Sequence, residues 1–114
     1  MHLTILICTH NRAPLLAQAL DYLNAATRPA GCDVDIMVAA NACSDETHAY
    51  LDHYRERQAS QNLLSLSWFA EPKPGKSNAL NSAVAQFSSD WVSIVDDDHR
   101  VSSNFLEQIA SAIA

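Results

Sequence analysis

The sequence of 114 residues predicts an α/β fold with a Rossmann-like open sheet whose strands are mainly parallel. Four short apolar runs alternate along the chain with four segments that have helical periodicity, which gives four β/α units. Strands separated by helices pair in parallel through right-handed crossovers. Because 48% of the residues are hydrophobic and the length suits one core, we expect residues 1–114 to form a single domain.

The first unit begins with a strand over Leu3–Cys8, whose unbroken apolar run predicts burial on both faces of a sheet. Pro14 is tolerated in the first turn of a helix, so a helix is expected from there. The apolar stripe of this helix comprises Leu15, Leu16, Ala19, Leu20 and Leu23.

The second unit is a strand over Val34–Ala39, followed by a helix with Asp45 and Glu46 in its first turn. The inner stripe of this helix comprises Thr47, Tyr50, Leu51 and Tyr54.

The third unit is a strand over Leu63–Phe69, a loop over Glu71–Ser77 and a helix over Ala79–Phe87. The fourth unit is a short strand over Trp91–Val95 and a helix that begins near Ser103 or Asn104. The inner side of this last helix comprises Phe105, Leu106, Ile109 and Ile113.

The most polar segments of the chain follow the four strands. In open α/β sheets, ligands bind beyond the carboxyl ends of the strands. The segments that this rule selects are Thr9–Arg12, Ala40–Asp45, Ala70–Ser77 and Asp96–Arg100. We therefore expect a ligand site at that edge of the sheet.

Three consecutive aspartates follow the fourth strand. In an extended stretch Asp96 and Asp98 point the same way, and two carboxylates on one side suit Mg²⁺ or Mn²⁺. The alternative is a solvated acidic loop that caps the last helix. The position at the end of a buried strand favours the metal site.

Gly75–Ser77 invites comparison with the phosphate-binding P-loop, but Ala70 stands where that motif needs its first glycine. Pro72 and Pro74 also remove two N–H donors from the loop. A P-loop is therefore not predicted. Lys76 or the start of the following helix could lie near a diphosphate, or the loop could be a proline-stiffened turn with an exposed lysine.

Other polar side chains have two interpretations each. Asn78 and Asn81 could face a ligand from one side of a helix, or form an ordinary polar helix end. His10 could stack on a base or fill a loop. His99 could be a metal ligand or a bystander.

The charge and the cysteines exclude some classes of function. A net charge of −6 argues against nucleic-acid binding, although a bound divalent metal would still permit a phosphate ligand. Cys8, Cys32 and Cys43 contain no C-x-x-C pair and have no histidine at ligand spacing, so zinc is not expected. With neither a signal peptide nor an apolar run of membrane-spanning length, the sequence predicts a reduced cytoplasmic protein, with a peripheral position on the inner face of a membrane as the alternative.

The four strand-end segments, taken in order, resemble the N-terminal part of family 2 glycosyltransferases, which have the GT-A fold. Ile5–Arg12 is similar to the opening strand of that family and its ICT-(Y/H)-NR turn, and Val38–Asp45 to the second strand and its VVDNGSxD turn. Glu71–Asn81 resembles the E-x-x-x-G-x-x-x-A-x-N segment, and Val95–Arg100 the DxD metal motif. The resemblance covers essentially the whole chain.

This resemblance implies a domain that binds a nucleotide-diphosphate sugar through Mg²⁺ or Mn²⁺, for inverting transfer to an unknown saccharide, lipid or protein acceptor. It implies that Thr9 and His10 line the nucleobase pocket and that Asp98, with Asp96, holds the metal. The full set of implied nucleotide-sugar-binding residues is Thr9, His10, Asn11, Arg12, Asn41, Asp45, Lys76, Asn78, Asp96 and Asp97.

The sequence departs from the family pattern in two places. Ala40 stands where family members often have an aspartate that binds the base edge, so the usual uridine preference does not carry over. The catalytic base of the family comes well after the DxD motif, so none is assigned here and the domain is expected to be truncated before it. A non-catalytic nucleotide-sugar-binding module, or an enzyme remnant, is the alternative function. A nucleotidyltransferase is disfavoured because Thr9–Arg12 replaces its Gly/Arg/Lys-rich first turn.

An open sheet that lacks later strands leaves an edge uncovered, so self-association through that edge is also expected.

Overall fold

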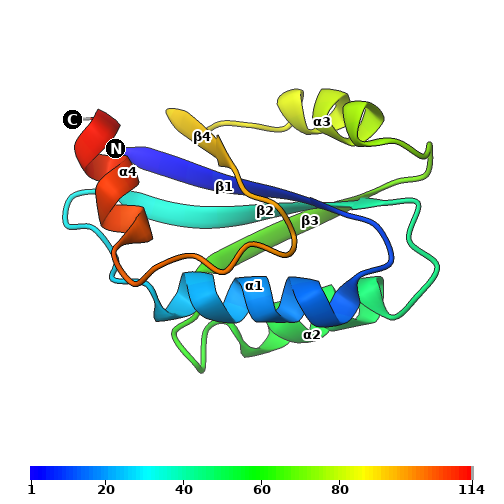
Figure 1. Cartoon of the computed structure of the whole chain (residues 1–114), viewed down its shortest axis with the longest axis horizontal. Coiled ribbons are helices and arrows are strands. Elements are labelled where there is room, and N and C mark those ends of the chain that lie inside the picture. The colour runs from blue at the N-terminus through cyan, green and yellow to red at the C-terminus, as the bar shows by residue number, and fades with distance from the viewer. Residues whose placement is uncertain (114) are drawn as a thin grey trace.

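The computed structural model describes residues 1–113, which form a sheet of four parallel strands and four helices (Figure 1). In chain order the elements are β1 (His2–Thr9), α1 (Ala13–Ala25), β2 (Asp33–Asn41), α2 (Thr47–Arg57), β3 (Ser65–Glu71), α3 (Lys76–Val84), β4 (Trp91–Ile94) and α4 (Phe105–Ile113). The predicted α/β fold with a parallel sheet is confirmed. Within the described residues, none of the helices has the length and apolar character that crossing a membrane requires.

The strand order is β3-β2-β1-β4, so the direction of the crossovers reverses beside β1. The first two crossovers lead outward from β1 to β2 and β3, and the third returns across the sheet to β4. Right-handed crossovers that run in opposite directions place their helices on opposite faces. Accordingly α1 and α2 cover one face of the sheet and α3 covers the other (Figure 1).

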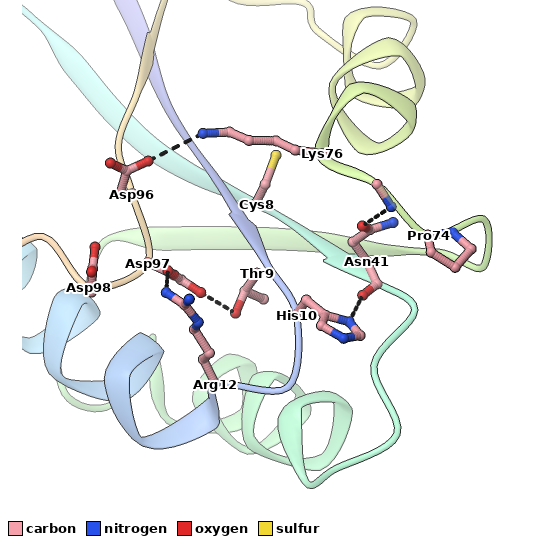
Figure 2. Close-up of a pocket in the computed structure, with 11 residues that line it drawn as sticks. Cys8, Thr9, His10, Arg12, Asn41, Pro74, Lys76, Asp96, Asp97 and Asp98 are labelled. Carbon is pink, nitrogen blue, oxygen red and sulfur yellow. Dashed lines mark hydrogen bonds and ion pairs between the residues drawn. The ribbon is translucent and has the colours of Figure 1, made fainter.

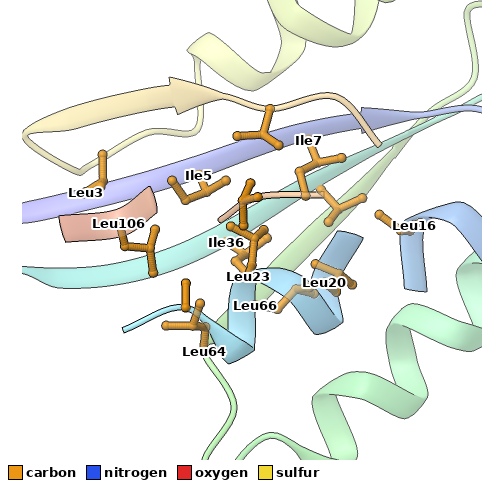
Figure 3. Close-up of a cluster of buried hydrophobic side chains, with 14 of the residues drawn as sticks. Leu3, Ile5, Ile7, Leu16, Leu20, Leu23, Ile36, Leu64, Leu66 and Leu106 are labelled. Carbon is orange, nitrogen blue, oxygen red and sulfur yellow. The ribbon is translucent and has the colours of Figure 1, made fainter. Parts of the chain in front are cut away.

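The main hydrophobic core lies between the sheet and α1. Leu3, Ile5 and Ile7 of β1 are at most 1% exposed and belong to the same buried cluster as three leucines of α1, Leu16, Leu20 and Leu23 (Figure 3). Thr4 and Leu6 alternate with them and are also buried, which confirms that β1 is buried on both faces.

The stripe of α1 is narrower than predicted. Leu16, Ala19, Leu20 and Leu23 are buried as expected, and they follow the i, i+3, i+4, i+7 spacing of a single helix face. Leu15 is 39% exposed, so its placement in the stripe was wrong. Adjacent residues of a helix point in directions about 100° apart, so Leu15 lies outside the face on which Leu16 packs.

The acidic residues before α2 lie outside the helix, since α2 begins at Thr47. Asp45 accepts hydrogen bonds from the Thr47 backbone N–H at 3.0 Å and from its hydroxyl. The carboxylate thus stabilises the start of the helix from outside its first turn, which corrects the predicted placement of Asp45 and Glu46.

The third unit is also shifted relative to its prediction. Pairing with Asp35–Asn41 extends β3 to Glu71 and starts it at Ser65 instead of Leu63. The N–H groups of Asn78 and Ala79 both donate to the carbonyl of Gly75, so α3 begins three residues before the predicted start, and it ends at Val84 instead of Phe87.

β4 lies at the edge of the sheet and carries exposed apolar side chains. Trp91, Val92 and Ile94 are between 39% and 55% exposed, and Val84 at the end of α3 is 69% exposed. The described part of the chain therefore leaves this edge apolar and uncovered.

Tyr54 provides a test of the packing between α2 and the rest of the fold. It is buried, donates its hydroxyl to the Leu64 carbonyl at 2.8 Å and accepts from Asn24 Nδ2 at 3.0 Å. Tyr54→Phe would leave the buried Leu64 carbonyl and the half-buried Asn24 amide without this partner and should lower the free energy of unfolding by about 1–3 kcal/mol. Chemical denaturation measures the loss. Tyr22→Phe, at a 42% exposed position, is the matched control, and equal stability of both variants would contradict the assignment.

Candidate functional site

A pocket of about 470 Å³ lies at the carboxyl edge of the sheet, where the crossovers change direction beside β1. It is lined by Cys8, Thr9, His10, Arg12, Asn41, Pro74, Gly75, Lys76, Asp96, Asp97 and Asp98. All four polar segments that follow the strands contribute to this lining. The structure therefore brings together eight of the residues singled out in the sequence: Thr9, His10, Arg12, Asn41, Lys76, Asp96, Asp97 and Asp98.

Asp97 joins the turn after β1 to the turn after β4. Its side chain is 9% exposed and accepts hydrogen bonds from Thr9 Oγ1 at 3.0 Å and from Arg12 Nη1 at 3.3 Å (Figure 2). A buried carboxylate needs such charge-assisted partners, because desolvation of an unpaired charge is costly. Asp97 is thus engaged within the protein, whereas Arg12 remains about half exposed in the pocket.

The aspartate segment is a turn. The His99 N–H donates to the Asp96 carbonyl at 3.1 Å, so the expectation of an extended stretch was wrong, and strand alternation does not govern its side chains. The turn is needed because the chain must leave β4 and reach α4. Asp96 and Asp98 are nevertheless both exposed and both line the pocket, while His99 packs edge-on against Phe105 with ring centroids 5.9 Å apart.

Lys76 approaches this turn from the opposite wall. It is the first residue of α3, and its Nζ lies 3.3 Å from Asp96 Oδ1 (Figure 2). Both side chains are more than half exposed, so the ion pair contributes little to stability. An anionic group of a ligand could therefore replace Asp96 as the partner of Lys76.

Asp96 and Asp98 have the chemistry that a hard divalent cation prefers, since both present carboxylate oxygens to the pocket. Within residues 1–113, however, no group of three or more Asp, Glu, His and Cys side chains is close enough to hold a metal unaided. The residues present fit a cation that completes its coordination with water or with oxygens of a bound ligand.

His10 and Asn41 form the wall opposite the aspartates. His10 Nδ1 lies 2.7 Å from the Asn41 carbonyl oxygen. Because a carbonyl oxygen only accepts, Nδ1 is the donor in this hydrogen bond. The Asn41 side chain forms hydrogen bonds with the backbone at the end of β3 and in the loop after it, at Glu71, Lys73 and Gly75.

Three of the predicted residues do not line the pocket. Asn11 Oδ1 accepts from the backbone N–H groups of Ser44 at 2.7 Å and Asp45 at 3.2 Å, which ties the first turn to the second. Asp45 accepts from the Ala13 N–H at 3.4 Å, and Asn78 Nδ2 donates to the Pro74 carbonyl at 2.9 Å. These side chains hold the loops around the pocket in place.

Cys8, Pro74 and Gly75 line the pocket without having been predicted to do so. Cys8 could have been found from strand alternation, since it faces away from the buried Ile7 and immediately precedes Thr9. Burial raises the pKa of the Cys8 thiol, so it is protonated at neutral pH. Gly75 has a φ of +120°, a conformation that L side chains rarely adopt. Because the sequence has only two glycines, each one indicates a special backbone position, and this could have pointed to Gly75.

The fold is a Rossmann-like α/β domain with a pocket at the carboxyl edge of its parallel sheet. The family model described as glycosyl transferase family 2 matches residues 4–114, and the chain therefore belongs to this family. The resemblance stated from the sequence is confirmed. No curated protein sequence matches the chain significantly.

Solved structures of glycosyltransferases share this fold. The crystal structure of S. aureus TarS 1–349 is 21% identical, with a TM-score of 0.81 over 99% of this chain and 32% of that one. A second TarS structure, in complex with UDP-GlcNAc, is 22% identical, with a TM-score of 0.78 over 99% and 31% of the two chains. The mannosyltransferase PcManGT from Pyrobaculum calidifontis, in complex with GDP-Man and Mn²⁺, is 26% identical, with a TM-score of 0.80 over 97% and 31%. The chain thus spans about a third of the length of these proteins.

Asp45 provides a pH-dependent test of the loops around the pocket. Hydrogen bonds, first from the Thr47 hydroxyl and then from the backbone N–H groups of Thr47 and Ala13, lower the pKa of Asp45 below 3.8. A carboxylate with a lowered folded-state pKa stabilises the fold above its unfolded pKa, and this stabilisation is lost as the pH falls through the folded value. Asp45→Asn should therefore lower the melting temperature at pH 7 and make its decline below about pH 4 shallower. Melting curves from pH 7 to pH 2.5 measure this, with the exposed Asp21→Asn as control. An Asp45→Asn profile parallel to that of the wild type would contradict the role of this carboxylate.

Proposed function

We propose that this domain binds the nucleotide-diphosphate sugar donor of an inverting glycosyltransferase, with Mg²⁺ or Mn²⁺ held at its DxD motif. The observation that carries the proposal is the convergence of Asp96, Asp98 and Lys76 on one pocket at the carboxyl edge of the sheet. Membership of the family and the fold shared with proteins solved with UDP-GlcNAc or GDP-Man support it.

The nucleobase lies at the end of β1 in this proposal. Thr9 and His10 line the pocket there, and the His10 ring is held by the Asn41 carbonyl in an orientation that a base could stack on. Ala40 is buried and offers no side-chain acceptor to the base edge. The base is therefore bound by stacking and by the fixed imidazole, without the aspartate common in the family.

The diphosphate lies between Lys76, Arg12 and the aspartate turn. Both cationic side chains line the pocket and are more than half exposed, so each has N–H groups free for phosphate oxygens. Asp98 and Asp96 would hold the divalent metal, which when bound supplies positive charge to a diphosphate that becomes more negative as the sugar departs. Asp97 keeps Arg12 at the pocket through its hydrogen bond.

Acceptor activation requires a further carboxylate in this proposal. Inverting transfer needs a base that deprotonates the acceptor hydroxyl. Among the described residues, the three carboxylates of the pocket already have tasks, since Asp97 bonds to Thr9 and Arg12, and Asp96 and Asp98 hold the metal. We therefore assign donor binding to this domain and assign the base to none of these three carboxylates.

The proposal predicts nucleotide binding that depends on a divalent metal and on Asp98. Calorimetric titration with UDP and with GDP should give binding in Mn²⁺ that disappears in EDTA. Asp98→Asn should weaken it by about 10- to 100-fold, as disturbed metal sites do. The exposed Asp21→Asn should bind as the wild type does. Nucleotide affinity that is equal with and without Mn²⁺ would refute the metal site, and no binding of either nucleotide would refute donor binding.

We also propose that the domain associates with itself through the edge strand β4. Val92 and Ile94 are exposed on this strand, and an uncovered apolar strand edge is a template for pairing.

This second proposal predicts concentration-dependent assembly in sedimentation velocity. Ile94→Lys should shift the protein to monomer, because a lysine on an edge strand disfavours pairing. Leu15→Lys is the matched control, since Leu15 is exposed on the distant α1. A wild type that stays monomeric at every concentration would contradict the proposal.

A further inference from the structure

We infer that Asn41 is a positioning residue, which fixes the loop Glu71–Gly75 and through it places Lys76 at the pocket. The inference rests on the proposed function in one respect, namely that Lys76 contacts the diphosphate of the donor. It assigns to Asn41 an indirect contribution to donor binding, made through the backbone of a neighbouring loop.

The hydrogen bonds of the Asn41 side chain all run to this loop. Nδ2 donates to the carbonyls of Glu71 at 3.3 Å and Lys73 at 2.8 Å, while Oδ1 accepts from the Gly75 N–H at 2.9 Å. Figure 2 shows the amide directed toward the loop at Pro74. Asn41 is 6% exposed, and both of its N–H donors are used. The amide is therefore committed to the loop and has little left to offer a ligand.

The loop needs such an anchor because of its own sequence. Pro72 and Pro74 have no N–H, so two of its five residues cannot donate a backbone hydrogen bond. Gly75 sits at a φ of +120°, where the chain changes direction before α3. Asn41 contacts the loop at its start, its middle and its end, and so holds a segment that lies beyond the last paired residue of β3.

The position of Gly75 determines where Lys76 lies. The Gly75 carbonyl accepts from Asn78 and Ala79, which sets the first turn of α3, and Lys76 is the first residue of that helix. From there Lys76 reaches across the pocket to Asp96. The Asn41 carbonyl also accepts from His10 Nδ1. One residue at the end of β2 therefore contacts both the turn after β1, through His10, and the loop before α3, through Gly75.

Asparagine is required because the loop presents two acceptors and one donor. An aspartate of the same shape could still accept from Gly75, but it would face the carbonyls of Glu71 and Lys73 with a negative oxygen. Asn41→Asp is thus a nearly isosteric change that removes two hydrogen bonds and adds repulsion, without opening a cavity.

The test combines amide hydrogen exchange with a double-mutant cycle in the 114-residue chain. Asn41→Asp should speed exchange of the Gly75 and Lys76 amides and weaken Mn²⁺-dependent binding of UDP or GDP by about tenfold. Lys76→Met should weaken binding while leaving exchange of the Gly75 amide unchanged. In the double variant, affinity should be no lower than in Lys76→Met alone, because Asn41 acts through Lys76. Asn62→Asp makes the same chemical change at an exposed position outside the pocket and should alter neither measurement.

Two results would overturn the inference. One is Asn41→Asp with wild-type exchange at Gly75. The other is losses of affinity from Asn41→Asp and Lys76→Met that add in the double variant, since a purely structural or independent role gives additivity. If Asn41→Asp does not fold, Asn41→Ser carries the same test, because its shorter side chain cannot reach Lys73 and Gly75 together. A wild type that binds no nucleotide would contradict the proposed function, whereas the exchange measurements would still decide the anchoring of the loop.

Discussion

The parallel pairing of β1 with β2 on one side and with β4 on the other is the constraint on which the rest of the structure depends. It requires the third crossover to return across the sheet, and it therefore places α3 on the face opposite α1 and α2. The carboxyl ends of β1 and β4 become neighbours, although they are more than eighty residues apart in sequence. The bond from Thr9 to Asp97 joins them. The pocket is the space left above these two strand ends.

The pocket contains basic as well as acidic side chains, which the negative net charge of the chain does not suggest. The protein is acidic overall, yet two of its seven basic side chains, Arg12 and Lys76, line the pocket beside three aspartates. Each is paired with one carboxylate, Arg12 with the buried Asp97 and Lys76 with the exposed Asp96. The two ion pairs differ in burial. The pair of Arg12 with the buried Asp97 is a fixed structural contact, whereas the exposed pair of Lys76 with Asp96 can open when a ligand offers another anion.

Pattern and strand-end rules predicted the fold class, the location of the pocket and most of its lining residues. They succeeded because the burial of β1 on both faces and the polarity after each strand are both evident from short runs of consecutive residues. They failed for Leu15, because tertiary packing of α1 leaves it just beyond the buried face. They also failed for the aspartate segment, because a local turn closed by the His99 N–H and the Asp96 carbonyl replaces the expected extended stretch. The roles of Asp97 and Asn41 could not be predicted from local pattern, because they depend on partners 30 to 88 residues away in the sequence.

Two alanines of α3 have a consequence for how this domain tolerates change. Ala79 and Ala83 are fully buried, so the helix approaches the sheet through side chains with almost no volume. Any larger residue at either position would push α3 away from β1 and β2, and Lys76 would move with the end of the helix. Sequence variation on the face of α3 hidden from solvent could therefore adjust ligand affinity from a distance, without altering a single pocket side chain.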